Sequence, residues 1–395
     1  MSFDIALSGI KAINGQLEVT SNNIANSGTY GFKSSRANFS SLYAGEHANG
    51  VEVGSMTQSI GINGSVQTTG RSLDAAIQGR GFFVSKDQSG VMSYSRVGIF
   101  NVNKDGFVVD SVGRQVQGYG PTKGGALGTL GNLQIPTGQI PAQVSTRIGM
   151  VANLSADWTA PAVAFSPTDS TSYNMAKQSV LFDSLGSQHT VSQYFVKTGA
   201  NTVDVYFGFD GNPPVATDRT TLNFDNAGVL SAASATKALS FAPTNGAAVL
   251  PFTIDYRGTT QFAGESTTTT NSTDGFAAGA FVGVELGPDG SVIAKYSNEQ
   301  QQVIGTVGIA TFPDEGALTS ISDTSWSANT ESGNALYGTP GSGLNGKLST
   351  GTLEGSNVDV TSELVGLMTS QRNYQANSKV ISTENAMMQA LMQAM

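Results

Sequence analysis

Residues able to carry out chemistry are few in this 395-residue chain, and they do not cluster along it. The two histidines, His47 and His189, lie in polar surroundings, and neither has a partner at the HxxxH or HExxH spacing of zinc sites. The chain has no cysteine, which excludes disulfide bonds and thiolate catalysis. It also has no Gly-x-Ser-x-Gly segment of the kind that presents a nucleophilic serine. We therefore predict no catalytic residue, no metal site and no cofactor, and we expect that the protein is not an enzyme.

Two glycine-rich segments match ligand-binding patterns only in part. Gly341–Gly346 has the GxGxxG spacing of a dinucleotide-binding loop, but Pro340 precedes it and no helical pattern follows, so we predict a turn. Asn101–Gly106 (NVNKDG) resembles the start of a calcium loop. The twelfth position of such a loop must be a glutamate, and here it is Val112, so a hairpin turn is the better interpretation.

The composition points to a protein whose surface is unusually poor in charge. Charged residues make up 12% of the chain, against roughly 25% in typical soluble domains. A surface that ends up against copies of the same chain needs little charge, although a Gly/Ser/Thr-rich extracellular β protein would show the same composition. The net charge is −9 and no basic block occurs, so nucleic-acid binding is not expected.

The N-terminal residues do not predict a secretory signal. MSFDIALSGI has no basic start, no unbroken apolar stretch and no small-residue cleavage site. The chain also lacks a run of about 18 apolar residues, so we expect no membrane insertion. If the protein leaves the cell, we expect an export route without a cleaved signal.

The elements that organise the chain begin with an amphipathic helix at the N-terminus. From Phe3 to Ile24 the seam positions recur in alternating steps of four and three, the period of a coiled coil. These positions are Phe3, Leu7, Ile10, Asn14, Leu17, Ser21 and Ile24. Small residues lie largely off the seam and would let another helix approach closely on a second face; they are Ala6, Ser8, Gly9, Ala12 and Gly15.

The C-terminus repeats this alternation over a longer span, from Val360 to Met395, with Asp359 at the N-cap position. Its seam includes Leu364, Leu367, Tyr374, Ile381 and Met388. We predict that the two terminal helices form an antiparallel pair; the alternative is that the C-terminal helix packs on its own domain. Because it is longer than its partner, part of its apolar stripe must face another subunit or solvent.

The middle of the chain has the composition of β structure. Strand-like runs occur at Gly81–Ser85, Val191–Val196 and Val203–Phe207. Turn signals occur at Lys104–Gly106, Asp183–Gly186, Asn226–Gly228 and Pro288–Gly290. No helical pattern alternates with the strands, which argues against a parallel α/β sheet. We interpret Ser266–Thr273 (STTTTNST) as a low-complexity loop.

These observations predict a mainly β fold with α-helical termini: paired terminal coiled-coil helices plus two nested, discontinuous β domains. The outward crossing is expected in Val144–Pro161 and the return in Gly275–Gly287. The expected boundaries are 1–27 with 360–395 for the helical core, 28–69 with 351–359 for a linking segment, 70–147 with 283–350 for an inner β domain, and 148–282 for an inserted outer β domain.

Motifs at both ends resemble those of the flagellar rod and hook protein family. Ser21–Lys33 (SNNIANSGTYGFK) resembles the N-terminal signature of that family. At the other end, Leu353–Val360 (LEGSNVDV) and Gln371–Lys379 (QRNYQANSK) resemble the matching C-terminal region. Four internal segments resemble the hook members in particular: Gly70–Ile77, Gly81–Phe83, Tyr94–Arg96 and Tyr296–Gln300.

The resemblance implies assembly, not catalysis. Subunits of the hook would pass through the flagellar export apparatus and polymerise into a flexible extracellular tube, a universal joint that transmits motor torque to the filament. The implied partners are the chain itself, the distal rod protein, the hook cap and the hook-filament junction protein. Residues expected at subunit interfaces are Phe3, Leu7, Ile10, Leu17, Ile24, Asn22, Asn23, Asn26, Gly31, Phe32, Leu364, Leu367, Tyr374, Ile381 and Met388.

Two alternatives stay open from the sequence. The first is a distal rod protein of the same family, which would be rigid and shorter. The second is a secreted β-rich adhesin or glycosidase, which would be a soluble, monodisperse protein.

Overall fold

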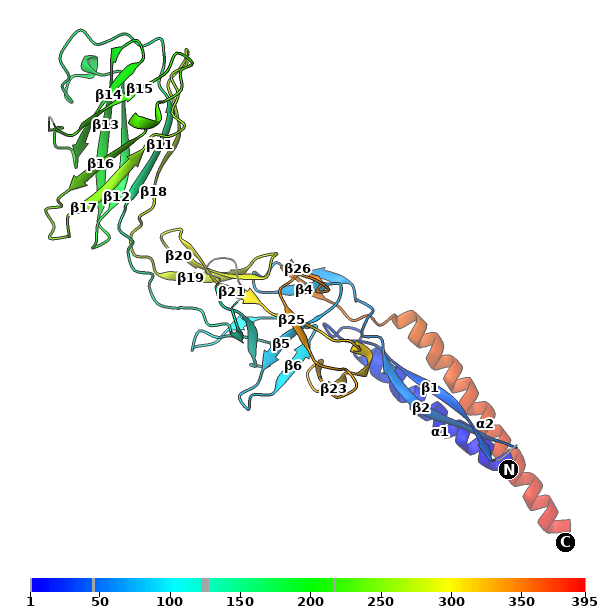
Figure 1. Cartoon of the computed structure of the whole chain (residues 1–395). Helices are drawn as coiled ribbons and strands as arrows, with labels where there is room; N and C mark the ends of the chain where they lie inside the picture. The colour runs from blue at the N-terminus through cyan, green and yellow to red at the C-terminus, as the bar shows by residue number, and fades with distance from the viewer. Residues whose placement is uncertain (1, 45–46, 122–127, 216, 395) are drawn as a thin grey trace. The chain divides into compact units, whose positions relative to one another are not determined.

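The computed structural model describes residues 2–44, 47–121, 128–215 and 217–394 (Figure 1). The chain divides into two compact units. The first unit comprises Met1–Thr137, Gly283–Lys295 and Gln301–Met395, and the second comprises Gly138–Val282 and Tyr296–Gln300. The second unit therefore begins at Gly138, ahead of the expected start of the outer domain at 148.

Two long helices form at the positions predicted from the heptad-like spacing. Helix α1 spans Ser2–Ala25 and helix α2 spans Val360–Ala394, while Met395 lies outside the described residues. The carboxylate of Asp359 caps α2 as expected: its Oδ1 accepts a hydrogen bond from the backbone N–H of Thr361 at 2.9 Å. Hydrogen bonds from Ser362 and Thr361 hold the pKa of Asp359 below its usual value.

The helices lie antiparallel, and two contacts fix their register. Asn23 Nδ2 donates to Glu363 Oε1 at 2.7 Å, and a Cβ on Gly9 would lie 3.1 Å from Asn377 Oδ1. In both pairs the residue numbers add to 386, so Ser2 lies opposite Glu384 and α2 continues past the start of α1. Figure 1 shows this overhang at the C-terminal end of the chain.

A long β-hairpin follows α1 and was not predicted. Strands β1 (Ser35–Ala44) and β2 (His47–Gln58) pair antiparallel, with register shifts at Asn38/Phe39 and Ser41/Tyr43. Both strands pack along α1, within the stretch that the sequence suggested was only a linking segment. Glycines, the register shifts and exposed apolar side chains such as Phe39 and Met56 hide the alternation that would have identified these strands.

The β region of the first unit is built by both halves of the chain. Its strands from the N-terminal half are β3 (Val66–Thr68), β4 (Ala75–Gln78), β5 (Phe82–Lys86), β6 (Met92–Ser95), β7 (Asn101–Val102), β8 (Val108–Val109), β9 (Gln115–Tyr119) and β10 (Leu130–Asn132). Those from the C-terminal half are β19 (Phe281–Leu286), β20 (Ser291–Tyr296), β21 (Gln301–Val307), β22 (Ile309–Thr311), β23 (Thr319–Ile321), β24 (Ser325–Ser327), β25 (Leu336–Gly338), β26 (Lys347–Thr350) and β27 (Thr352–Glu354), of which β19 and β20 each extend into the second unit. A short 3₁₀ helix spans Glu315–Ala317.

Pairings across the chain hold this region together. Strand β9 pairs with β21, β5 with β22, β4 with β26, and β3 with β27, all antiparallel. An aromatic core lies beneath β5 and β6, where Phe82 contacts Trp326 at 5.5 Å between ring centroids and Tyr94 contacts Phe312 at 4.8 Å. Neither half of the chain can complete this core alone.

The second unit is a sandwich of two four-stranded sheets. One sheet has the order β12 (Met175–Phe182), β13 (Gln188–Gly199), β14 (Thr202–Phe209), β15 (Arg219–Asn223). The other has the order β16 (Thr236–Phe241), β17 (Leu250–Asp255), β11 (Arg147–Asn153), β18 (Thr267–Thr273), and short 3₁₀ helices span Ser170–Ser172 and Ala232–Ser234. Buried side chains from both sheets, among them Ile148, Phe195 and Phe252, form one core.

Two sequence-based expectations for this unit are wrong. Ser266–Thr273 was expected to be a loop, but Thr267–Thr273 is the edge strand β18, paired antiparallel with β11. Threonine is β-branched and suits a strand, and a polar run is tolerated where one face is solvated. The expected outward crossing, Val144–Pro161, instead contains β11, a strand of the sandwich itself.

Both glycine-rich segments are turns, as predicted. Gly341 has φ +71° and its N–H donates to the carbonyl of Gly346 at 2.9 Å. In the other segment, β7 and β8 form a hairpin in which Asn103 Oδ1 accepts from the N–H groups of Asp105 and Phe107. In the part of the chain that the structure describes, no group of acidic, histidine or cysteine side chains could hold a metal ion. The described helices are also too short or too polar to cross a membrane.

Candidate assembly surface

The buried stripe of α1 is displaced by one residue from the predicted seam. Phe3 and Leu7 were expected inside the helix pair, but their side chains are 40% and 36% exposed. The buried face instead carries the small residues, and its buried members are Ala6, Gly9, Ala12, Ile13, Thr20 and Asn23. Small side chains let α2 and the hairpin approach α1 closely, so this face of α1 packs toward them. Ile13 is buried with the small residues, but Phe3 and Leu7 are left toward the outside.

The remaining apolar seam residues of α1, Ile10, Leu17 and Ile24, are half-buried, whereas the polar seam residues Asn14 and Ser21 are exposed. Leu17 and Tyr374, one predicted seam residue from each helix, line one shallow groove of about 280 Å³ between the helices. The prediction of an antiparallel pair is therefore correct, and the prediction of which α1 stripe forms its interior is wrong.

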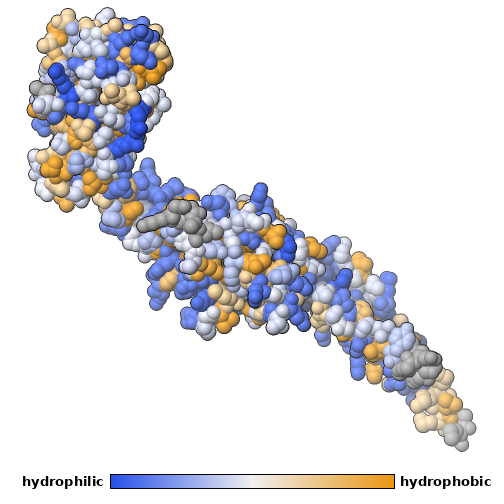
Figure 2. Space-filling view, viewed as in Figure 1, coloured by the Kyte–Doolittle hydropathy of each residue, from blue (hydrophilic) through white to orange (hydrophobic). Residues whose placement is uncertain are grey.

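Helix α2 is covered along one narrow stripe only. Leu367 and Ile381 are half-buried there, and Ser370 is buried. By contrast, Leu364 and Met388 are 46% and 61% exposed. Further exposed apolar side chains on α2 are Val360, Val365, Met368, Tyr374, Val380, Met387, Leu391 and Met392. Figure 2 shows hydrophobic residues gathered at the C-terminal end of this helix.

The asparagines of the N-terminal motif have different environments. Asn23 is buried and links three elements: its amide bonds both the N–H and the C=O of Ser35, and it donates to Glu363. Asn22 is exposed, and its Oδ1 accepts from Asn26 Nδ2 at 2.7 Å. Asn23 thus has its hydrogen bonds inside its own subunit, whereas Asn22 faces outward.

Gly31 and Phe32 join the helices to the β region. Gly31 has φ +69°, where a side chain is disfavoured, and a Cβ there would lie 3.0 Å from the backbone of Arg96. Its N–H donates to the carbonyl of Glu354 at 2.8 Å. Both residues were expected at a subunit interface. In the single chain Gly31 is already buried and Phe32 is half-buried.

A buried ionic cluster lies directly after these two residues. Its only trace in the sequence is the pair of motifs Gly-Phe-Lys and Leu-Glu-Gly, and it was not predicted. Lys33 Nζ contacts Glu354 Oε1 at 2.6 Å and donates to the carbonyl of Ile62 at 2.6 Å. Arg96 Nη1 contacts the other carboxylate oxygen of Glu354 at 3.4 Å. Burial lowers the pKa of Lys33 and of Arg96, and the carboxylate of Glu354 opposes both shifts. One carboxylate therefore balances two buried cations.

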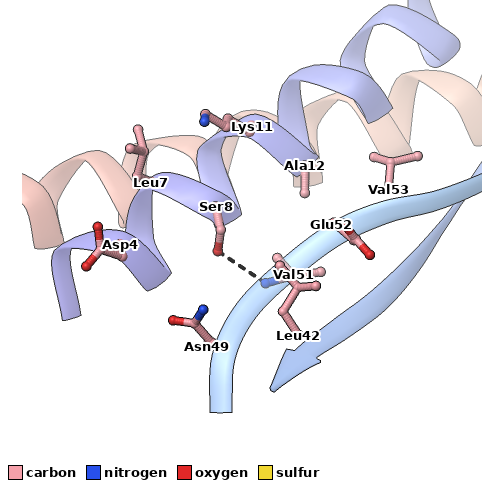
Figure 3. A pocket seen from close by; sticks show the side chains of 10 residues that line it. All are labelled: Asp4, Leu7, Ser8, Lys11, Ala12, Leu42, Asn49, Val51, Glu52 and Val53. Carbon is pink, nitrogen blue, oxygen red and sulfur yellow. Dashed lines mark hydrogen bonds between the residues drawn. The ribbon is translucent and has the colours of Figure 1, made fainter. Parts of the chain in front are cut away.

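A groove of about 510 Å³ lies between the N-terminal half of α1 and the hairpin (Figure 3). Ser8 Oγ accepts a hydrogen bond from the backbone N–H of Val51 at 3.1 Å on its floor. Leu7, Ala12, Leu42 and Val53 supply apolar walls, and the charged residues of its rim are Asp4, Lys11 and Glu52. These residues form a mixed surface rather than a chemical site.

Family models match four segments of the chain in order. Residues 3–33 match the model described as flagella basal body rod protein, and residues 76–152 match the flagellar hook protein FlgE/F/G D1 domain. Residues 153–276 match the flagellar basal body protein FlaE D2 domain, and residues 349–394 match the flagellar basal body rod FlgEFG protein C-terminal model.

Full-length relatives decide the family. The chain is 37% identical to the flagellar hook protein FlgE of Escherichia coli K12, over 99% of both chains. The chain belongs to the flagellar hook protein family. The hook protein of Brucella suis is 31% identical over 98% of this chain and 96% of the relative. The crystal structure of Helicobacter pylori flagellar hook protein FlgE2 has a TM-score of 0.54 at 15% identity, covering 73% of this chain and all of that one, and it supports the fold alone.

The buried ionic cluster connects residues from the two family matches at the ends of the chain. Lys33 is the last residue of the N-terminal match, and Glu354 lies in the C-terminal match. Arg96 belongs to the D1 match between them. The exposed apolar side chains described above also lie in the terminal matches, on α1 and α2.

Proposed function

We propose that this chain is the repeating subunit of the bacterial flagellar hook, a flexible extracellular tube that transmits motor torque to the filament. The observation that carries this proposal is the 37% identity to a flagellar hook protein over 99% of both chains. A likeness of this extent covers the terminal helices, the inner β region and the inserted sandwich together. It is a structural role, and we propose no enzymatic activity.

The exposed apolar side chains on the terminal helices support a polymeric state. Phe3 and Leu7 on α1, and Leu364 and Met388 on α2, are exposed in the single chain. A lone soluble protein rarely leaves such a long apolar stripe uncovered. Copies that bury these stripes against different surfaces of their neighbours would form an open helical array, which is the geometry that a tube requires.

The division of the chain suggests how the subunit contributes to a bending tube. We assign the terminal helices, 1–27 and 360–395, to the inside of the tube, and the β region, 70–147 and 283–350, to its wall. The segments 28–69 and 351–359 connect these parts and contact neighbours. The sandwich within 148–282 would form the outer surface, where polar, weakly charged contacts can slide as the tube bends.

Partners other than the chain itself follow from the same role. The proposed partners are the distal rod protein below the hook, the cap during growth, and the hook-filament junction protein above. The flagellar export apparatus would deliver the subunit, without membrane insertion and without nucleic acid.

Two alternative functions are not favoured. A distal rod protein shares the end motifs, but the full-length relatives are named hook proteins. A secreted adhesin or glycosidase would not account for four consecutive matches to flagellar models.

Electron microscopy of the purified chain tests the proposal. We expect hollow tubes that bend when the protein is concentrated, and restored motility when the gene complements a hookless strain. Straight, rigid tubes with no bending would favour the rod alternative. A protein that stays monomeric at all concentrations and cannot complement the strain would contradict the hook function.

A further inference from the structure

The C-terminal overhang of α2 presents an apolar ridge that its own chain does not cover. The register places Ser2 opposite Glu384, and every described side chain from Asn385 to Gln393 is exposed. This stretch has no charged residue. Its long apolar side chains fall on one face of the helix, and we call them the ridge: Met387, Met388, Leu391 and Met392. A helix end without packing is marginal in water, so the ridge requires a partner.

An apolar groove lies elsewhere on the same unit. It measures about 640 Å³ and is bounded by α1, the hairpin and the middle of α2. The described residues that line it are all uncharged, and two of the apolar ones, Ile5 and Phe39, are 40% and 45% exposed. The small residues Gly9 and Ala12 leave space in the groove, and Val51 and Ala376 also line it. It therefore differs from the groove of Figure 3, whose rim carries Asp4, Lys11 and Glu52.

The ridge cannot enter the groove of its own chain. Asn377 lines the groove, and Met388 lies eleven positions further along α2, roughly 16 Å along the helix axis. The helix would have to break to fold back. Another copy has no such restriction.

We propose that the ridge of one subunit docks in the uncharged groove of a second copy of this chain. Three features support this pairing: both surfaces lack charge, both are uncovered, and each lies beyond reach of the other within one chain. Unbranched methionine side chains adapt to an irregular groove. Because ridge and groove are different surfaces, each copy can receive one neighbour and dock into another, so the contact is open-ended. This inference rests on the hook function and specifies one contact within it.

Cysteine cross-linking tests the contact directly, because the natural chain has no cysteine. The doubly substituted chain Leu391→Cys, Phe39→Cys is assembled and oxidised, and the products are separated under denaturing conditions. We expect a ladder of covalent oligomers. The control Gln393→Cys, Phe39→Cys moves the first thiol to the opposite face of the helix and should give little ladder. A third chain, Leu391→Cys, Leu42→Cys, probes the charged groove of Figure 3 in the same way.

The outcomes separate this inference from the function on which it rests. Equal ladders from the first two chains, a closed dimer only, or a ladder only with Leu42→Cys would overturn the docking assignment. If the wild-type chain forms tubes in the electron microscope while the ladder is missing, the hook function stands and the ridge contact fails.

A charge substitution provides an independent measurement. Met388→Asp should raise the critical concentration for polymerisation at least about tenfold, because a charge buried without a partner costs more than the free energy of a tenfold change. Gln389→Asp, off the ridge on the same turn, should leave the critical concentration near the wild-type value. An equal effect of both substitutions would contradict the proposal. Unchanged fluorescence of Trp326 in each variant, measured in a Trp158→Phe background, would show that the β region is folded.

Discussion

Lys33 and Glu354 lie 321 positions apart in the chain, and their side chains meet at 2.6 Å in the interior of the first unit. Arg96 contacts the same carboxylate, so Glu354 holds together the N-terminal segment, the β region and the segment that leads into α2. The backbone N–H of Gly64 also donates to this carboxylate, at 3.0 Å. The connection between the helices and the β region thus depends on Glu354, a residue near the C-terminal end of the sequence.

Neutralising this carboxylate should destabilise the first unit strongly. Glu354→Gln leaves two buried cations without their counter-ion, and we expect the free energy of unfolding to fall by about 3–5 kcal/mol. The matched control is Glu285→Gln, which removes the same charge from a partly exposed pair with Lys295 and should cost less than about 1 kcal/mol. Denaturant unfolding followed by Trp326 fluorescence, in a Trp158→Phe background, measures both. Equal losses would show that the cluster has no special role.

A second substitution probes the close packing beside the cluster. A Cβ on Gly64 would lie 1.9 Å from the carbonyl oxygen of Gly355, a backbone atom that cannot move aside cheaply. Gly64→Ala should therefore lower the free energy of unfolding by about 2 kcal/mol or more. Gly61→Ala, three residues earlier, meets no atom within 4 Å and should be close to neutral. The same denaturant assay compares them, and a silent Gly64→Ala would disprove the packing argument.

The second unit should lose stability as the pH rises through the titration of His189. Burial alone would lower the pKa of His189, but its hydrogen bonds to Asp210 at 2.7 Å and to Asp183 at 3.0 Å raise it above the ordinary 6.5. The stabilisation is therefore complete below pH 6.5 and is lost as the pH rises through the raised, folded-state pKa. Asp183, whose pKa is lowered to about 2, stays ionised throughout this range.

Trp158 packs against the core of the second unit and reports on it once Trp326 has been changed to Phe. Unfolding measured at a series of pH values should show the decline in wild type and a flatter profile in His189→Gln. A wild-type profile that rises with pH through this range would refute the assignment.

Periodicity predicted the elements that depend on local spacing. The 4-3 alternation located α1 and α2, and Asp359 marked the start of α2 because capping is a local interaction. Turn residues likewise located the hairpin after Asn103. The same reasoning chose the wrong α1 stripe, because it ranked Phe3 and Leu7 by their hydrophobicity. The structure places Gly9 and Ala12 inward, since close approach of three elements requires small side chains.

Features that depend on partners far along the chain were not predictable. Nothing near Lys33 in the sequence indicates that Glu354 will neutralise it, and the environment of Asn23 depends equally on Glu363. The hairpin β1–β2 was missed because its inner face is defined by α1, not by its own alternation. Strand β18 was missed because threonine repeats resemble loops until an edge position beside β11 is available.

Removing the sandwich should leave a subunit that still polymerises. The outgoing and returning segments run side by side, with Ile140 and Gly279 exchanging two backbone hydrogen bonds at 2.9 and 3.1 Å, so a short Gly/Ser linker can replace residues 138–282. We expect tubes with altered bending and unchanged Trp326 emission. This cut removes β11 whole instead of dividing it. If the shortened chain keeps a folded β region and forms no tubes, the sandwich is part of the essential subunit contact.

Two adjacent positions on α1 distinguish packing within a chain from packing between chains. Ala6 is 3% exposed and faces the interior of the helical region, whereas Leu7 is 36% exposed and faces out. Ala6→Asp should expose both termini of the monomer to proteolysis, because a buried charge without a partner costs several kcal/mol. Leu7→Asp should leave the monomer's protease pattern unchanged and abolish tubes and motility, because Leu7 becomes buried only on assembly. The substitutions introduce the same charge one residue apart, so helix propensity and position along the helix are nearly matched. If Leu7→Asp assembled normally, the exposed stripe of α1 would face solvent in the tube, and the contacts between subunits would have to lie on α2 and the hairpin instead.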